Sequence, residues 1–303
     1  MLLRCTLNLP GYGVFISGQS PFLLQPGTLM KTIKIQNKTI PTLGFGTWKL
    51  TGDGCIKATE MALDIGYRHI DTAQIYENES EVGQAIKNSG LERRDIFLTT
   101  KIWLENVSKD RFVKSVDESL KKLKTEYVDL LLLHWPVGGV PLKEQLEALA
   151  AVQKSGKAAL IGVSNYPVAL MRAVLDDYGV KIANDQVEYH PFLSQKPVLD
   201  FARAHNMWVT AYSPLARGTV RGDPVLKRIG DKYGKNEGQV ALRWLTQQPD
   251  VAAIPKAASE ANIRSNIDIY DFTLSDEEMD AIFALARPDG RMVDPDWAPD
   301  WDH

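Results

Sequence analysis

The sequence has little of what defines several large protein classes. It holds only two cysteines, Cys5 and Cys55, in 303 residues, which argues against a disulfide framework or a structural zinc site. No apolar run approaches the roughly 18 residues of a membrane span. Charges nearly cancel, with 35 Lys and Arg against 38 Asp and Glu, so we expect no basic surface for nucleic acid or anionic lipid. With 44% apolar residues, the sequence predicts a soluble, cytoplasmic protein with one large core.

The sequence also lacks the motifs of a catalytic metal site, of a Rossmann dinucleotide-binding fold and of a serine hydrolase. Five histidines occur and none form a His-x-His pair, so we expect no catalytic metal. The Gly-x-Gly-x-x-Gly fingerprint of a Rossmann fold is absent, because Gly44-Phe45-Gly46 is followed by Trp48 and Lys49. No Gly-x-Ser-x-Gly elbow marks a serine hydrolase. The chemistry must therefore come from other residues.

Residues 1–29 differ from the rest of the chain. They carry three prolines and four glycines, and Arg4 is their only charged residue. Pro10 and Gly11 interrupt the apolar stretch that a secretory signal would need. We expect residues 1–29 to be a disordered extension, or translated upstream sequence with Met30 as the true start. Residues 30–303 are expected to form a single domain.

From Met30 onward, strand-like and helix-like segments alternate. KTIKI and KTIPTLGF, around Gln36-Asn37-Lys38, predict a β-hairpin. Short apolar runs then predict strands buried on both faces, at 43–48, 68–73, 96–103, 127–135, 159–165, 184–189, 207–213 and 251–256. Helices are expected at 57–64, 80–88, 108–124, 142–154, from Pro167, and at 197–205, 224–233, 237–246, 259–266 and 275–286. This order predicts an α/β fold, a (β/α)₈ TIM barrel with an N-terminal β-hairpin, extra C-terminal helices and a tail.

The helix at 108–124 indicates its buried face through the spacing of its apolar residues. Val113, Val116, Leu120 and Leu123 recur at helical spacing, and we expect them to face the core. Ser108 precedes the first turn and is a candidate N-cap.

Polar residues stand at the strand ends of the predicted barrel, where active sites of this fold lie. Seven fall at or near such ends: Asp71, Lys101, His134, Asn165, Gln186, Tyr212 and Lys256. Each could separately be a buried polar group or a solvated rim residue. Seven on one face of the barrel predict a functional site.

Four of the residues after adjacent strands suit carbonyl reduction. Asp71 and Tyr76 follow the second strand, Lys101 ends the third and His134 ends the fourth. A phenol is a poor acid at neutral pH unless a neighbour tunes it, and an ammonium group lowers its pKa. We therefore expect Lys101, held by Asp71, to lower the pKa of Tyr76. Tyr76 would donate a proton to the carbonyl oxygen, which His134 would orient.

At this point several motifs identify a resemblance to a known family. GYRHIDTAQIYENESEVG (66–83), TTKIW (99–103), LLLHWP (131–136), IGVSN (161–165), NDQVEYHP (184–191), YSPLARG (212–218) and IPKAAS (254–259) resemble the aldo-keto reductase superfamily. The resemblance implies a barrel that reduces aldehydes and ketones with NADPH, usually as a monomer. It also implies a catalytic tetrad of Asp71, Tyr76, Lys101 and His134.

The resemblance further implies a set of cofactor-binding residues. They are Gly46, Thr47, Trp48, Asp71, Ser164, Asn165, Gln186, Tyr212, Ser213, Leu215, Lys256, Ser259, Asn262 and Asn266. Many members of the family have an arginine where this chain has Asn262, and the nearest arginine here is Arg264. Because arginine is a strong bidentate phosphate partner, its absence leaves Lys256 as the main charge for a 2′-phosphate. We expect NADPH to be preferred, with NADH possible.

The substrate pocket implied by the resemblance is lined by Trp48, Tyr76, Trp103, His134 and Trp135. The short connection at 136–141 and the tail at 287–302 are similar to the bacterial branch of 2,5-diketo-D-gluconate and methylglyoxal reductases. We expect the tail to fold over the barrel mouth. The substrates expected are small α-dicarbonyls or keto-sugar acids, such as methylglyoxal or 2,5-diketo-D-gluconate.

A second class of function stays open at this stage. Some relatives of the fold are regulatory subunits that bind a nicotinamide cofactor and sense its redox state with little turnover. An intact tetrad is compatible with both readings. The partner expected for the enzyme is a small carbonyl compound, with no nucleic acid and no membrane.

Overall fold

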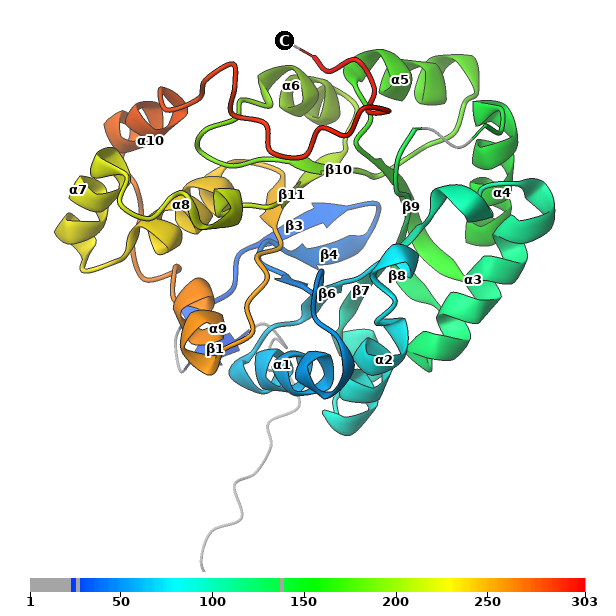
Figure 1. The fold of residues 1–303 in the computed structure, drawn as a ribbon, viewed down its shortest axis with the longest axis horizontal. Helices are drawn as coiled ribbons and strands as arrows, with labels where there is room; N and C mark the ends of the chain where they lie inside the picture. The colour runs from blue at the N-terminus through cyan, green and yellow to red at the C-terminus, as the bar shows by residue number, and fades with distance from the viewer. Residues whose placement is uncertain (1–22, 26–27, 137–138, 303) are drawn as a thin grey trace, which may run out of the picture.

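The computed structural model describes residues 23–25, 28–136 and 139–302, and a barrel of eight parallel strands lies at its centre (Figure 1). Neighbouring strands follow the order of the chain from β5 to β12. A parallel bridge between Leu43 and Ala253 closes the sheet on itself, with the Gly44 N–H donating to the Ala253 carbonyl at 2.8 Å. The strands are β5 Phe45–Gly46, β6 His69–Asp71, β7 Phe97–Ile102, β8 Val128–Leu133, β9 Ala158–Ser164, β10 Asn184–Glu188, β11 Trp208–Tyr212 and β12 Val251–Ala253. The predicted (β/α)₈ barrel is confirmed.

Helices surround the barrel and cover the outward faces of its strands (Figure 1). They are α1 Gly52–Ile65, α2 Glu79–Asn88, α3 Lys109–Leu123, α4 Leu142–Lys154, α5 Val168–Arg172, α6 Lys196–Ala204, α7 Pro224–Tyr233, α8 Glu237–Gln247, α9 Glu260–Ile267 and α10 Asp276–Phe283. Local sequence fixes several of the boundaries. Gly66 ends α1 with a φ of 123°, and capping boxes at Asn236 and Ser275 begin α8 and α10. No helix of the described residues is long and apolar enough to cross a membrane.

One expected core position in α3 is wrong. Val113 is 41% exposed, and Phe112 is buried in its place. Successive side chains of a helix point about 100° apart. When Phe112 faces the core together with Val116, Leu120 and Leu123, its neighbour Val113 faces solvent. Val116, Leu120 and Leu123 are buried as expected. Ser108 stands at the N-cap position, but its side chain makes no capping hydrogen bond.

The predicted hairpin closes one end of the barrel. Its strands are β3 Thr32–Ile35 and β4 Lys38–Pro41, which pair antiparallel. Gln36 and Asn37 both have positive φ, as a two-residue hairpin turn requires. Apolar residues of the hairpin pack on residues from the amino-terminal part of the barrel, in a cluster of Ile33, Ile35, Ile40, Phe97, Leu130, Leu132, Leu160, Ala183, Trp208 and Ala252. Because this cluster fills one end, a ligand must enter at the other.

The N-terminal segment is described only in small part. Strands β1 Leu23–Gln25 and β2 Thr28–Leu29 pair antiparallel. Residues 1–22 and 26–27 lie outside the described residues. The interpretation of residues 1–29 as a disordered or non-native extension therefore stays a prediction.

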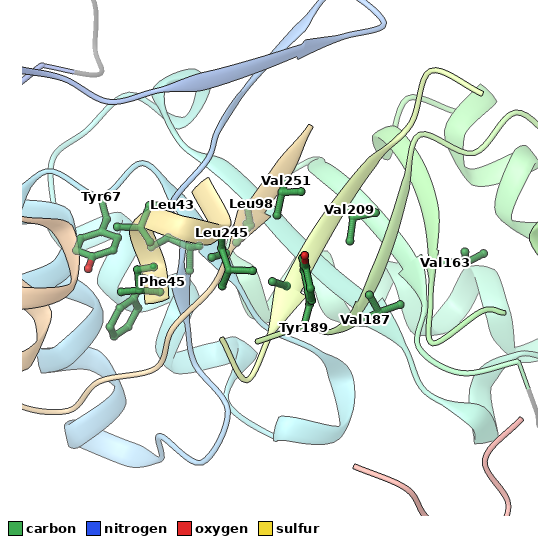
Figure 2. Packing of buried hydrophobic residues seen from close by; sticks show 14 of the residues in the cluster. Leu43, Phe45, Tyr67, Leu98, Val163, Val187, Tyr189, Val209, Leu245 and Val251 are labelled. Atoms are coloured by element: carbon green, nitrogen blue, oxygen red, sulfur yellow. The ribbon is translucent and has the colours of Figure 1, made fainter. Parts of the chain in front are cut away.

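The main core lies between the strands and the helices (Figure 2). Phe45 and Tyr67 meet edge to face, with ring centroids 5.9 Å apart, and the Tyr67 hydroxyl donates to the Ile263 carbonyl at 3.0 Å. That contact attaches the late helix α9 to the first strands. Truncating a fully buried residue such as Leu98 to alanine would cost about 2–5 kcal/mol.

Candidate active site

A cavity of about 970 Å³ opens at the carboxyl ends of the strands. Most of the residues predicted for the site line it: Gly46, Thr47, Trp48, Asp71, Tyr76, Trp103, His134, Trp135, Asn165, Gln186, Tyr212, Ser213, Leu215, Lys256, Asn262 and Asn266. Three predicted residues do not. Lys101 and Ser164 are buried behind the wall, and Ser259 begins helix α9 at the surface. The site expected from strand ends thus coincides with a single deep cavity.

Lys101 lies at the centre of a buried polar cluster. Its Nζ donates to Asp71 Oδ1 at 2.5 Å and to the Thr72 carbonyl at 2.8 Å, and it lies 3.5 Å from the Tyr76 hydroxyl. Asp71 and Lys101 come from the adjacent strands β6 and β7, and the 3₁₀ turn Gln74–Tyr76 returns the tyrosine over them. The sequence therefore brings together a phenol, an ammonium group and a carboxylate.

His134 completes the cluster from the end of β8. Its ring meets Tyr76 edge to face at 5.8 Å between centroids and Trp103 at 5.2 Å. The imidazole borders the cavity, while its Nδ1 is buried without a hydrogen-bond partner. All four predicted tetrad residues are therefore neighbours at one end of the cavity.

The protonation of this cluster follows from burial. Burial raises the pKa of Tyr76 well above its ordinary value, and the Asp71 carboxylate adds to the effect. Burial also lowers the pKa of Lys101, against the opposing effect of Asp71. For His134, burial and the Lys101 charge together hold the pKa well below its ordinary value. At neutral pH, Tyr76 is a neutral phenol and His134 a neutral imidazole.

The expectation that Lys101 lowers the pKa of Tyr76 is wrong in this structure. The ammonium group lies 1.0 Å closer to Asp71 Oδ1 (2.5 Å) than to the phenol oxygen (3.5 Å). The carboxylate therefore neutralises most of the positive charge that the phenol would feel, and desolvation of the phenolate dominates. The same desolvation keeps the proton on Tyr76, where it is available for donation.

Side-chain amides continue from the cluster along the cavity wall. Gln186 Nε2 donates to Asp71 Oδ2 at 2.8 Å, so Asp71 is shared between this amide and Lys101. Asn165 Nδ2 donates to the His134 carbonyl at 3.0 Å, and its Oδ1 accepts from the Tyr212 hydroxyl at 2.8 Å. These contacts fix two amides and one aromatic ring beside the tetrad.

Charged side chains also line the cavity. They are Arg217, Arg221, Lys256 and Glu237, and the amide side chains of Asn262 and Asn266 join them. A cavity lined by side-chain amides, an aromatic ring and cations fits a nicotinamide dinucleotide, which carries a carboxamide, a planar ring and phosphates. Among the residues that the structure describes, no group of three or more His, Cys, Asp and Glu side chains could hold a metal ion.

The structure shows whether Arg264 takes the place of the arginine that many family members have at the position of Asn262. Arg264 does not border the cavity, and its Nε donates to Glu260 Oε1 at 2.8 Å on the exposed side of α9. Arg264 therefore does not replace the missing arginine in this arrangement.

Two polar residues that support the site were not predicted. Gln74 Oε1 accepts from the Trp103 N–H at 2.9 Å, while its Nε2 donates to Ser119 of α3. Asn78 is fully buried at the N-cap position of α2 but does not cap that helix. No local pattern identifies either residue, because their partners lie far along the chain.

Asn78 instead connects the two loops on either side of the tetrad. Its Nδ2 donates to the carbonyls of Thr47 and Leu50 at 2.8 and 2.9 Å, and its Oδ1 accepts from the Thr72 hydroxyl at 2.7 Å. Thr72 also supplies the carbonyl that holds Lys101. The Asn78 side chain thus links the loop that carries Trp48 to the segment between β6 and α2, which carries Tyr76.

Aromatic residues form the mouth of the cavity, where the tail joins them. Trp48 is 42% exposed, with Lys49 Nζ 4.5 Å and Arg217 Cζ 5.9 Å from its ring. Trp135 meets two tail residues edge to face, Trp297 at 5.0 Å and Trp301 at 6.1 Å. The tail therefore packs at the mouth as expected.

Comparisons with known proteins agree with this geometry. The aldo/keto reductase family model matches residues 42–287. Methylglyoxal reductase DkgB of Salmonella typhi is 43% identical over 268 residues, which cover 87% of this chain and 100% of that protein. A crystal structure assigned as a 2,5-diketo-D-gluconic acid reductase B has a TM-score of 0.89 and 48% identity, covering 91% of this chain and 98% of that one. The Bombyx mori aldo-keto reductase in complex with NADP has a TM-score of 0.79 and 32% identity, covering 85% and 93%.

Proposed function

The chain belongs to the aldo/keto reductase family, and we propose that it is an NADPH-dependent reductase of small aldehydes and ketones in which Tyr76 is the proton donor. Family membership makes it an oxidoreductase that acts on carbonyl compounds with a nicotinamide cofactor. The observation that carries the finer proposal is the placement of Tyr76. Its neutral phenol lies 3.5 Å from Lys101 Nζ and borders the cavity beside His134.

The residues around Tyr76 have separate parts in this proposal. A reduced nicotinamide, when bound, supplies a hydride to the carbonyl carbon. Tyr76 donates its proton to the carbonyl oxygen, and the Lys101 ammonium group stabilises the negative charge left on the phenol oxygen. Asp71 keeps Lys101 charged and in place. His134, as a neutral imidazole, positions the carbonyl oxygen.

The cofactor would occupy the cavity from the amides to the cations. Asn165 and Gln186 would bind the carboxamide, and Tyr212 would stack on the nicotinamide ring. Ser213 and Leu215, which line the cavity, would contact the pyrophosphate, and Lys256 would hold the 2′-phosphate. A lysine at this position gains a charged partner only from NADPH, which supports a preference for NADPH over NADH.

The substrate proposed is a small α-dicarbonyl or a keto-sugar acid. The relatives support it, since one is a methylglyoxal reductase and another is assigned to 2,5-diketo-D-gluconic acid. The walls beside the tetrad are the aromatic rings of Trp48, Trp103 and Trp135. We propose further that residues 30–303 act as one barrel domain; the monomeric state and cytoplasmic location stay predictions.

The proposal is tested by following loss of the NADPH absorbance with methylglyoxal, 2,5-diketo-D-gluconate and a bulky steroid ketone. We expect turnover of the two small substrates, faster with NADPH than with NADH. Tight NADPH binding without turnover of any carbonyl would instead support the redox-sensing alternative. Equal turnover of methylglyoxal and the steroid would refute the substrate proposal alone.

A further inference from the structure

A buried carboxylate at the end of β10 holds the C-terminal tail. Glu188 is fully buried, and its two oxygens accept from consecutive backbone N–H groups of the tail. Met292 N lies 2.9 Å from Oε1 and 3.1 Å from Oε2, and Val293 N lies 2.8 Å from Oε2. His190 Nε2 also lies 2.9 Å from Oε1. Among the described residues, no Lys or Arg forms a salt bridge with Glu188.

This arrangement anchors the tail. A buried carboxylate is costly unless hydrogen bonds satisfy it, and here the tail supplies two of the donors. If the tail moved away, the Glu188 carboxylate would lose the N–H donors of Met292 and Val293 while still buried. Burial of Glu188 therefore favours an attached tail.

A second contact attaches the same tail independently of Glu188. The Arg287 N–H donates to the Phe192 carbonyl at 3.1 Å. Gly290 passes so close to that carbonyl that a Cβ on it would lie 1.8 Å from the oxygen. Only glycine allows this approach. The tail is therefore held at Phe192 by the segment from Arg287 to Gly290, and at Glu188 by Met292 and Val293.

The attached segment shapes the mouth of the cavity. Val293, which Glu188 holds through its N–H, borders the cavity. Beyond it, Trp297 and Trp301 pack on Trp135, and Trp297 remains 45% exposed. The tail therefore contributes to the cavity directly through Val293 and indirectly through the two tryptophans that pack on Trp135.

We propose that Glu188 is a specificity-determining positioning residue, which acts by holding the tail so that Val293 lines the substrate cavity and Trp297 packs behind Trp135, which lines it too. The proposal rests on the proposed reductase function. It goes beyond that function, because Glu188 does not itself line the cavity and makes no hydrogen bond to the tetrad. Substrates with a large apolar group next to the carbonyl depend on the anchored tail, and the smallest substrates do not.

The test compares methylglyoxal with phenylglyoxal, which differ only in a methyl or a phenyl group beside the same dicarbonyl. Glu188→Gln keeps the shape of the side chain but turns an amide N–H toward a tail N–H. We expect kcat/KM for phenylglyoxal to fall by roughly tenfold, mainly through KM, because the apolar wall is loosened. For methylglyoxal, kcat and KM should change less than about twofold, as should the Kd of NADPH. Trypsin should cut the variant faster after Arg291, which precedes Met292; the Arg287–Pro288 bond is not a tryptic site.

Two further variants separate the position of the tail from the charge of Glu188 and from a general effect of substitution. Gly290→Ala displaces the tail from the other attachment and should reproduce both effects with Glu188 intact. Glu144→Gln is the matched control, since Glu144 Oε1 accepts the Lys109 N–H at 2.9 Å on the exposed surface away from the cavity. It should change neither the substrate ratio nor the cleavage.

Several outcomes would overturn the proposal. One is an equal loss for both substrates in Glu188→Gln, which indicates a merely structural role. Another is a normal substrate ratio in Gly290→Ala despite faster tryptic cleavage. If Glu188→Gln fails to fold, Gly290→Ala decides alone. Absence of NADPH turnover in the wild type would refute the reductase function instead, and the cleavage rates would still show whether Glu188 anchors the tail.

Discussion

Replacing Lys101 tests the energetics of the buried cluster. Lys101→Met removes a fully buried ammonium group and leaves the Asp71 carboxylate, whose side chain is 2% exposed, without its counter-ion. Breaking a buried pair in this way typically costs about 3–5 kcal/mol. Because Gln186 still donates to the second Asp71 oxygen, we expect a loss of free energy of unfolding near the lower end, about 3 kcal/mol.

The double variant Asp71→Asn with Lys101→Met separates charge from packing. Because neither charge of the Asp71–Lys101 pair remains, the double variant should regain most of the free energy of unfolding that Lys101→Met loses. A cost of about 1 kcal/mol would remain for the Thr72 carbonyl, which loses its donor. Urea unfolding at pH 7 of the wild type, both single variants and the double variant measures the coupling. Both variants that lack Lys101 should be inactive. A double variant no more stable than Lys101→Met would refute the reasoning.

Three further predictions concern the rest of the site. Asn262→Arg should raise the NADPH-to-NADH ratio of kcat/KM by roughly tenfold, through a charge-assisted contact with the 2′-phosphate; an unchanged ratio would mean that the phosphate lies elsewhere. Burial lowers the pKa of His134, so below pH 6.5 the unfolded chain takes up a proton that the folded chain refuses, and stability falls with acidification. In urea unfolding between pH 7 and 5, His134→Asn should remove up to about 1.4 kcal/mol per pH unit of this slope. Asn78→Ala should lower kcat at least about tenfold. Ser275→Ala, which removes a true helix cap, should cost about 1 kcal/mol of stability and leave kcat unchanged.

The sequence predicted the barrel because its strands are buried on both faces. Runs such as VDLLLL (128–133) are continuous and apolar, and only a sheet covered by helices needs them. The same order of elements located the site, because parallel strands bring their carboxyl ends to one face. Asp71, Lys101 and Gln186 could therefore be grouped without knowledge of any distance.

Other features depended on contacts that no sequence pattern encodes. Asn78 occupies an N-cap position, and only the positions of Thr47 and Thr72 in space show that its side chain acts elsewhere. Glu188 is linked to residues more than 100 positions away. The direction of the pKa shift on Tyr76 depended on how completely the phenol is buried and on its closeness to the Asp71 carboxylate, neither of which the sequence shows.

The central claim is that Tyr76 donates the proton in carbonyl reduction. Its most direct test is kcat for methylglyoxal with saturating NADPH in the wild type and in Tyr76→Phe, with the Kd of NADPH measured for both. We predict a loss of kcat of about 10²–10⁴-fold with an unchanged Kd, because phenylalanine keeps the ring but has no proton to give. A Tyr76→Phe variant that retains the wild-type kcat would contradict the account and require another donor.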